Sequence, residues 1–598
     1  MKKQTGENQW KKILPEFLAV LLCLLLMGIG ISQKEGYHMD ELLSFELADA
    51  RYNPWIVPTQ PVGRLAKFVD EEIQETTLSA TVGNLKDTIM DVLKNRGSSK
   101  LLSYKADVYE EPVWITDKQF RDYVTVDGSD AFDYLSVYFN VKDDNHPPVH
   151  FMLLHTMSSI FQKTLSPLLG CAINLISLGI TLWLLLRLGR QLTDVLLPGM
   201  DGRWLGMTAV LLYGMSTGAL AMVLLIRMYG LLSCLCVALL SIHVEKWKNQ
   251  EFDRKNKGLT AVTVLGFLTQ YFFLFYCLLL AAVTAAVLMQ SRRKKELWIY
   301  IRSMVTAAVI GLFLFPFAIA DVFSSSRGTE ALGNLASGFR GYGERILTFG
   351  KILAERTVGI PLLVGGCIAG VVLLVVWLIR VIRRCRVQGE RVPAAEASRI
   401  SVGAIVAILT IPVAGYFLLA SRMSPYLVDR YIMPIFPFVS LLLALLLCWF
   451  GRKISEISGW KTRNAALCML AVILLVQGMR LIHYDGEYLY KGYRQQEQLA
   501  EAYASDPCIC VYVGVGYYEN LPEFMHYSKT LLLTEQELEN REDTESLEAL
   551  DHVVVMIKPG VEEATALNTL QEKYGFFLEE TLMSSGVHGD SIYLLGKK

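Results

Sequence analysis

Long apolar runs separated by clusters of basic residues dominate this sequence. The first run, 13–31, follows four lysines and has no small-residue cleavage site, so it predicts a retained membrane span rather than a removed signal peptide. Further basic clusters recur between the later runs. Because Lys and Arg gather in cytoplasmic loops, we expect a cytoplasmic N-terminus and an even number of crossings between successive clusters.

This parity requirement predicts about eleven spans. The runs 204–243 and 258–289 are each too long for one span, and we expect each to form a hairpin that turns near Arg227 and near Gln270-Tyr271 respectively. The other spans are predicted at 168–186, 300–320, 359–379, 402–420, 431–450 and 465–482.

The segment 146–163 is apolar but carries three histidines. If it crossed the membrane, every later basic loop would face outward, against the positive-inside rule. We therefore interpret it as an amphipathic helix that lies on the outer membrane surface.

Two parts of the chain are predicted to lie outside the cytoplasm: the loop 32–145 and the tail 485–598. The tail alternates β-rich runs with polar helical stretches, which indicates a small α/β domain. The predicted fold class is therefore an all-α polytopic membrane domain, 1–482, with juxtamembrane helices in its outer part 32–167, followed by an extracytoplasmic α/β domain, 483–598.

Composition agrees with a membrane protein, since 53% of the residues are hydrophobic and 19% are charged. The net charge of -1 excludes the basic excess expected of a nucleic-acid binder. Most cysteines fall in apolar runs, which excludes a disulfide framework and a zinc ribbon. Cys508 and Cys510, on a predicted strand, are expected to be buried small hydrophobic residues.

Two adjacent carboxylates, Asp40 and Glu41, follow the first span at the expected membrane boundary. A partly desolvated carboxylate there can act as a general base. The alternative is that both residues only cap the next helix, with Asp40 as its N-cap and Glu41 in its first turn.

A second group of candidates, Asp144, His146 and His150, surrounds a Pro-Pro pair directly before the surface helix. The alternative is a rigid junction between loop and helix, with histidines at the membrane interface. A divalent cation is possible here, but the spacing matches no metal motif.

The third signal is cationic. Arg227 is the only charge within about forty apolar residues, and Tyr229 lies beside it. Arg430-Tyr431 stands where an outer loop enters a span. Arginines beside tyrosines at the outer leaflet suit a lipid-linked phosphate, whereas the alternative is snorkelling of the guanidinium to lipid headgroups.

Five motifs in this order resemble the membrane glycosyltransferases of the GT-C fold, in particular the bacterial relatives of the dolichyl-phosphate-mannose protein mannosyltransferases and of the aminoarabinose transferase of lipid A. They are Asp40-Glu41, Asn145-His146-Pro147-Pro148, Arg227-Met228-Tyr229, the run 266–273, and Asp429-Arg430-Tyr431 followed by Pro434 and Pro437.

The resemblance implies an inverting transfer of a sugar from a polyprenyl-phosphate-linked donor to an acceptor protein, lipid or cell-envelope polymer on the outer face of a plasma membrane. Asp40 would deprotonate the acceptor hydroxyl, and Glu41 would orient or polarise it. The residues implied to bind the donor phosphate are Arg227, Tyr229, Arg430 and Tyr431. Those implied to line the substrate cavity are Asp144, His146, His150 and Tyr271. Two other functions stay open at this point: a transporter or lipid flippase, and a scaffold that presents the tail domain.

Overall fold

The computed structural model describes residues 2–252, 256–336, 340–366, 368, 375, 402–458, 461–484 and 486–597. The chain forms two compact units. The first unit contains Met1–Ser32, Asp144–His150 and Cys171–Glu487, and the second contains Gln33–Asp143, Phe151–Gly170 and Tyr488–Lys598.

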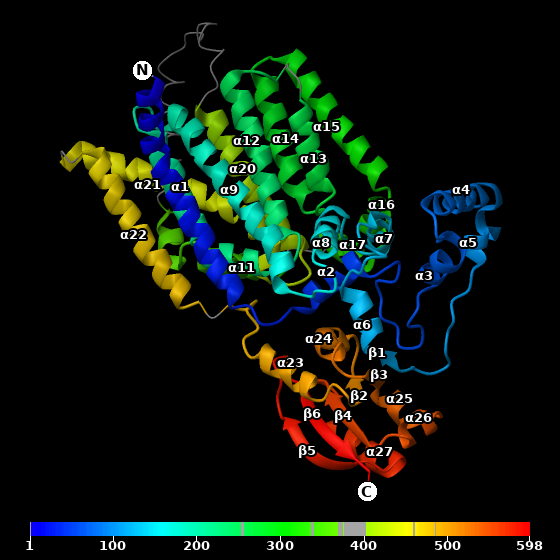
Figure 1. The fold of residues 1–598 in the computed structure, drawn as a ribbon. Helices are drawn as coiled ribbons and strands as arrows, with labels where there is room; N and C mark the ends of the chain where they lie inside the picture. The colour runs from blue at the N-terminus through cyan, green and yellow to red at the C-terminus, as the bar shows by residue number, and fades with distance from the viewer. Residues whose placement is uncertain are drawn as a thin grey trace. The chain divides into compact units, whose positions relative to one another are not determined.

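The first unit is helical (Figure 1). Its elements are α1 (Lys2–Ser32), α9 (Pro167–Leu196), α10 (Gly202–Gly214), α11 (Thr217–Leu224), α12 (Tyr229–Asn249), α13 (Lys257–Phe267), α14 (Phe273–Gln290), α15 (Lys294–Leu314), α16 (Ala318–Phe323), α17 (Ser326–Ala336), α18 (Tyr342–Arg356), α20 (Val402–Met423), η4 (Asp429–Tyr431), η5 (Met433–Ile435), α21 (Phe436–Ser458) and α22 (Thr462–Ile482). Helices α12, α13, α14 and α15 pack as neighbours, and α20 packs on α14.

Among the described residues, eight helices are long and apolar enough to cross a membrane, and the pair α10 and α11, bent by 59°, makes a ninth. The shorter apolar helix α13 corresponds to one more predicted span. The predicted span 359–379 lies largely outside the described residues. The structure thus confirms a polytopic helical membrane part.

Several helices begin or end some residues away from the predicted spans, for example α21 (Phe436–Ser458, expected at 431–450), and for one of the spans the cause is clear. We expected it at 300–320, but α15 covers Lys294–Leu314. Pro316 explains the early end, because a proline disfavours helical conformation in the residue before it and lacks an N–H to continue the helix. Both predicted turn positions are breaks between helices, since residues 225–228 separate α11 from α12 and residues 268–272 separate α13 from α14.

The second unit begins with the first loop. Its elements are α2 (Met39–Asp49), α3 (Arg64–Phe68), η1 (Val69–Ile73), α4 (Leu78–Asn95), η2 (Arg96–Ser98), α5 (Lys100–Ser103), β1 (Ile115–Thr116), α6 (Asp117–Val124), α7 (Tyr134–Asn140) and η3 (Val141–Asp143). Helix α8 (Val149–Ile160) follows and has 12 residues, about 18 Å, which is too short to cross a membrane. Its length agrees with the predicted surface helix.

The tail contributes the rest of the second unit. Its elements are α23 (Tyr493–Ala502), β2 (Cys508–Tyr512), η6 (Gly516–Asn520), α24 (Leu521–Phe524), β3 (Lys529–Thr534), α25 (Glu535–Asn540), α26 (Glu545–Glu548), β4 (His552–Ile557), α27 (Glu563–Tyr574), β5 (Phe577–Met583) and β6 (Ser591–Gly596). This confirms the predicted α/β domain.

One six-stranded sheet, in the order β1-β3-β2-β4-β6-β5, forms the centre of this domain. Strand β2 pairs in parallel with both β3 and β4, whereas the other pairs are antiparallel. The edge strand β1 comes from the first loop, so the loop completes the sheet of the tail.

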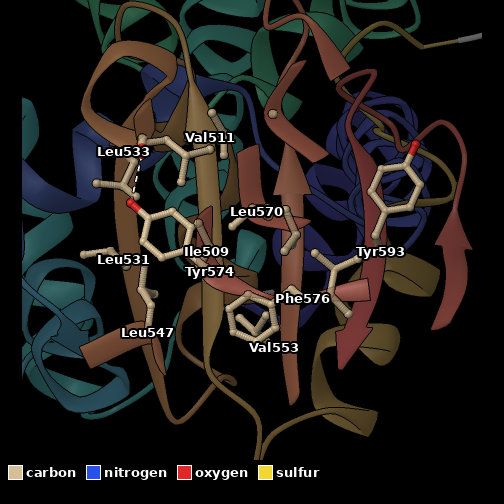
Figure 2. Packing of buried hydrophobic residues seen from close by; sticks show 14 of the residues in the cluster. Ile509, Val511, Leu531, Leu533, Leu547, Val553, Leu570, Tyr574, Phe576 and Tyr593 are labelled. Atoms are coloured by element: carbon tan, nitrogen blue, oxygen red, sulfur yellow. Dashed lines mark hydrogen bonds between the residues drawn. The ribbon is translucent and has the colours of Figure 1, made fainter. Parts of the chain in front are cut away.

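The sheet is covered by side chains on both faces. On one face, Ile509 and Val511 of β2 pack with Leu531, Val553 and Tyr574 (Figure 2). On β2 the alternate residues, Cys508 and Cys510, are also fully buried and are free thiols, as predicted. Strand β2 is thus a central strand with no solvent-facing side chain.

Candidate functional site

The residues before α8 place an acid and a histidine in contact. The Nδ1 atom of His146 lies 2.8 Å from Oδ2 of Asp144, and Asp144 is 7% exposed. Burial acts to raise the pKa of Asp144, but the neighbouring His146 and Arg227 outweigh burial and hold this pKa below its usual value. Asp144 is therefore an ionised, buried carboxylate.

Arg227 lies in the break between α11 and α12 and is 4% exposed. The break is stabilised from α9, where the Asn174 amide donates to the Leu225 carbonyl at 2.6 Å. The bond satisfies a carbonyl at the end of α11 that has no partner in its own helix. The position near Arg227 where the sequence predicted a turn is thus a break between two helices, and the Arg227 guanidinium is buried at this break.

His150, in the first turn of α8, belongs to the same group. It is fully buried, and burial, followed by the charges of Arg227 and His146, lowers its pKa to about 3. The His150 imidazole is therefore neutral at pH 7. Four of the candidate residues from the sequence, Asp144, His146, His150 and Arg227, are brought together.

Tyr271 adjoins this group from the turn between α13 and α14. Its hydroxyl donates to Oδ2 of Asp321 at 2.5 Å. Burial raises the pKa of Tyr271, and the nearby carboxylates of Asp321 and Asp144 raise it further. The Val149 N–H donates to the Leu268 carbonyl at 3.1 Å and joins the start of α8 to the same turn.

Sequence reasoning missed Asp321, which lies in α16 and is 6% exposed. The signal was present, because Asp321 is the one charged residue in the apolar stretch 303–326. Its placement at the expected end of a span made it look like an ordinary loop residue. The structure instead makes it the acceptor for a candidate tyrosine.

Arg430 and Tyr431 lie in η4, next to the turn that carries Tyr271. The Tyr431 ring packs against Phe272 with centroids 5.4 Å apart, and the Arg430 guanidinium lies 5.6 Å from the Tyr431 ring centroid. Tyr229 is the first residue of α12 and is 4% exposed, and α12 packs against η5. The donor-phosphate candidates therefore come from neighbouring elements.

An arginine that was not among the candidates from the sequence supports η4. Arg356, the last residue of α18, pairs through Nε with Oδ2 of Asp429 at 2.7 Å and through Nη2 with Glu487 at 2.9 Å. Its Nη1 donates to the Tyr484 hydroxyl at 2.7 Å. These bonds fix the residue before Arg430.

Asp40 and Glu41 lie in the second unit, in the first turn of α2. The helix is capped by His38, whose Nδ1 accepts from the Asp40 N–H at 3.0 Å, while the Glu41 carboxylate accepts from the His38 N–H at 2.8 Å. The N-cap is thus His38, and the expectation that Asp40 could be the cap is wrong. Because Nδ1 of His38 is an acceptor, it carries no proton there.

Glu41 is fully buried and ion-paired. The ammonium of Lys34 lies 2.9 and 3.2 Å from its two oxygens and also donates to the Tyr488 carbonyl at 2.7 Å. The side chain of Asp40 is 20% exposed. Of the two carboxylates, Asp40 is the one that a substrate can reach.

The part of the chain that the structure describes contains no group of three or more His, Cys, Asp or Glu side chains that could hold a metal ion. The ionisable candidates of the first unit instead form an acid, imidazole and guanidinium group: Asp144, His146, His150, Arg227, Tyr271 and Asp321. Such a set can bind an anion through Arg227 while its carboxylates orient the neighbouring donors.

No protein-family model and no curated protein matches this sequence. Among solved structures, the chain is similar to ArnT from Cupriavidus metallidurans bound to undecaprenyl phosphate, at 10% identity and a TM-score of 0.47, over 97% of each chain. It is also similar to ArnT from Cupriavidus metallidurans in the apo state, at 10% identity and a TM-score of 0.46, over 99% of this chain and 98% of that one.

Proposed function

We propose that this protein is an inverting glycosyltransferase that moves a sugar from a polyprenyl-phosphate-linked donor to a hydroxyl on the outer face of a membrane. The observation that carries the proposal is Arg227, a guanidinium buried at a helix break in an apolar helical unit. An arginine inside a membrane is costly and is retained for function. Its planar donors suit a phosphate.

The residues around Arg227 support this assignment. The His146–Asp144 contact and the Tyr271–Asp321 hydrogen bond hold polar groups in place, and the charge of Arg227 acts on Asp144, so little reorganisation is needed when charge appears. Arg430, on η4, would supply a second cation. The order of the five sequence motifs supports the same donor class.

In the proposed reaction Asp40 removes the proton of the acceptor hydroxyl, and the oxygen attacks the anomeric carbon of the sugar. The bond from that carbon to the phosphate oxygen breaks on the opposite side, which inverts the configuration. The leaving polyprenyl phosphate gains negative charge, which Arg227, Tyr229, Arg430 and Tyr431 would neutralise.

We assign Glu41 a positioning role. It is fully buried, binds Lys34 and accepts from the His38 N–H, so its oxygens are used within the protein. It therefore fixes the start of α2, where Asp40 lies one residue earlier. A base held on a rigid helix terminus is positioned more precisely than one on a loop.

The remaining parts of the proposal concern placement. In this proposal the helical part of 1–482 is the catalytic membrane domain, whereas 483–598, with the first loop that completes its sheet, lies outside the cytoplasm of a plasma membrane with a cytoplasmic N-terminus. Membrane lipids and the polyprenyl-linked sugar are the partners proposed for the membrane domain.

A lipid transporter is the second candidate, because one observation favours it. Broken helices inside a membrane are a feature of transporters, and α10 and α11 form one span that is bent by 59° at residues 215–216. Consumption of the donor separates the two functions, since a transporter moves a lipid without breaking its glycosidic bond.

The test is turnover by the full-length chain in lipid vesicles. A panel of radiolabelled polyprenyl-phosphate sugars is offered with a crude outer-surface acceptor fraction. We expect transfer by the wild type, and a loss of at least about 100-fold in Asp40→Asn with donor binding retained. The matched control is Asp117→Asn, because Asp117 is also in the first turn of a helix in the first loop. Equal turnover by wild type and Asp40→Asn would refute the role of Asp40.

A further inference from the structure

A polar group lies at the carboxyl ends of β2 and β4 in the tail domain. The chain leaves β2 for β3 on one side and later returns to form β4 on the other, with all three strands parallel. In sheets of this kind, ligands bind outside the carboxyl ends of the strands where the strand order reverses. Glu519 and Asn520 follow β2, and Lys558 follows β4, so these residues lie at that position.

Most of the polar side chains in this group bind one another in a closed network. The Lys558 ammonium lies 2.5 Å from Oδ1 of Asp590 and 2.8 Å from Oδ1 of Asn520, and it is 3.1 Å from Glu519. The second Asp590 oxygen accepts from Gln496 and from Asn520, both at 2.8 Å. Lys558 and Asp590 each have several partners, so the network is rigid. It carries excess negative charge because one ammonium faces two carboxylates.

His588 differs from the network around it. Its side chain is 8% exposed, and its Nε2 atom has no hydrogen-bond partner among the described residues. The other ring nitrogen, Nδ1, lies 3.9 Å from Glu519, and the ring lies 5.7 Å from both Tyr490 and Tyr493. A buried nitrogen without a partner is costly, so this atom points to a ligand.

The first loop reaches the same edge, within the same unit. The Glu35 N–H donates to the Leu489 carbonyl at 2.8 Å, and the Lys34 ammonium lies 5.2 Å from the Tyr490 ring centroid. A Cβ on Gly36 would lie 2.5 Å from the Tyr493 ring, so the two backbones approach closely there. Burial lowers the pKa of His588, and the charge of Lys558 lowers it further, whereas Glu519 acts in the opposite direction.

Tyr490 has a φ of 48°, in the left-handed region that non-glycine residues rarely adopt. Strained backbone of this kind persists where the surrounding structure requires it and is common at ligand sites. The strain is therefore a separate observation at this edge, beside the unpartnered His588 nitrogen.

We infer that the edge formed by His588, Glu519 and Tyr490 binds the acceptor, and that the acceptor is an uncharged carbohydrate. Hydroxyl groups can donate to the Glu519 carboxylate and can pair with a neutral imidazole in either direction. The excess of carboxylates repels a phosphate or carboxylate on the acceptor. This inference rests on the proposed function, since Asp40 lies two residues beyond His38 and would deprotonate one of the bound hydroxyls.

The experiment uses the full-length chain in lipid vesicles with labelled donor. The acceptors are a panel of neutral tetrasaccharides, each offered with and without a terminal phosphate. We expect kcat/KM to be at least about tenfold higher for the uncharged member of a pair. His588→Phe should raise the acceptor KM about tenfold with the donor KM unchanged, as expected for one lost hydrogen bond, and His588→Gln should recover part of the loss.

The matched control is His552→Phe, at the opposite end of β4 and half exposed, for which no change in acceptor KM is expected. Equal acceptor KM values for wild type and His588→Phe, or a preference for the phosphorylated acceptors, would overturn the inference. Donor consumption with transfer only to a peptide would overturn the acceptor class. An absence of donor consumption with every acceptor would instead contradict the proposed function.

Discussion

The buried pair Lys34–Glu41 offers a quantitative test of how the start of α2 is held. Both side chains are fully buried, and the Lys34 ammonium makes two bonds to Glu41 and one to the Tyr488 carbonyl. Lys34→Met keeps most of the volume but leaves a buried carboxylate without its cation. Removing one partner of a buried pair costs about 3–5 kcal/mol.

In a folded unit of this size, such a loss lowers Tm by roughly 10 °C. The double variant Lys34→Met/Glu41→Gln should recover most of the loss, because a glutamine oxygen can still accept from the His38 N–H while the unpaired charge is gone. Thermal unfolding in detergent, followed by intrinsic fluorescence, measures all three proteins, and kcat for transfer should fall and recover in parallel.

The control is Lys67→Met in the same loop. Lys67 pairs with Asp107 at 2.6 Å, but the Asp107 side chain is 67% exposed. Solvent screens an exposed pair, so Tm should change by no more than roughly 3 °C. If Lys34→Met lowers Tm no more than Lys67→Met does, or if the double variant is as unstable as the single one, the reasoning about the buried charge is refuted.

Two further predictions concern the charge of Arg227 and the protonation of Glu523. Arg227→Gln should lower kcat for transfer about 100-fold or more. Arg227→Lys should have an intermediate kcat, because an ammonium keeps the charge but loses the planar donors. Equal kcat values in wild type and both variants would exclude a role for the guanidinium. Burial raises the pKa of Glu523 to about 7, so the folded state binds a proton that the unfolded state releases. Stability should therefore fall as the pH rises from about 4.5 to 7, and Glu523→Gln should flatten this part of the Tm profile; an unchanged slope would contradict the assignment.

Hydropathy and charge were sufficient to predict the helical unit, because each span carries its own signal. The turn near Gln270-Tyr271 followed from the parity of basic loops, and the structure has it at 268–272. The end of α15 could also have been predicted from Pro316. Local chemistry of this kind can be read from neighbouring residues.

Long-range pairing could not be read in this way. Lys34 was not among the candidates from the sequence, and only the fold brings it to Glu41 and to the Tyr488 carbonyl. Asp321 became a candidate only because α16 carries it to the Tyr271 hydroxyl. Strand β1 has two residues, too few for any periodicity to be recognised.

Strand β1 also has a consequence for the order of assembly. It covers the edge of β3, and next to it the Arg541 guanidinium donates to the Pro112 carbonyl across 429 positions of sequence at 2.8 Å. Contacts between such distant segments form late, because the intervening chain must be made and its ends brought together. During synthesis the first loop therefore emerges without its partner strand and waits until the ribosome has translated all the helices of the first unit and then β3. A chaperone that shields this loop would have its greatest effect in that interval.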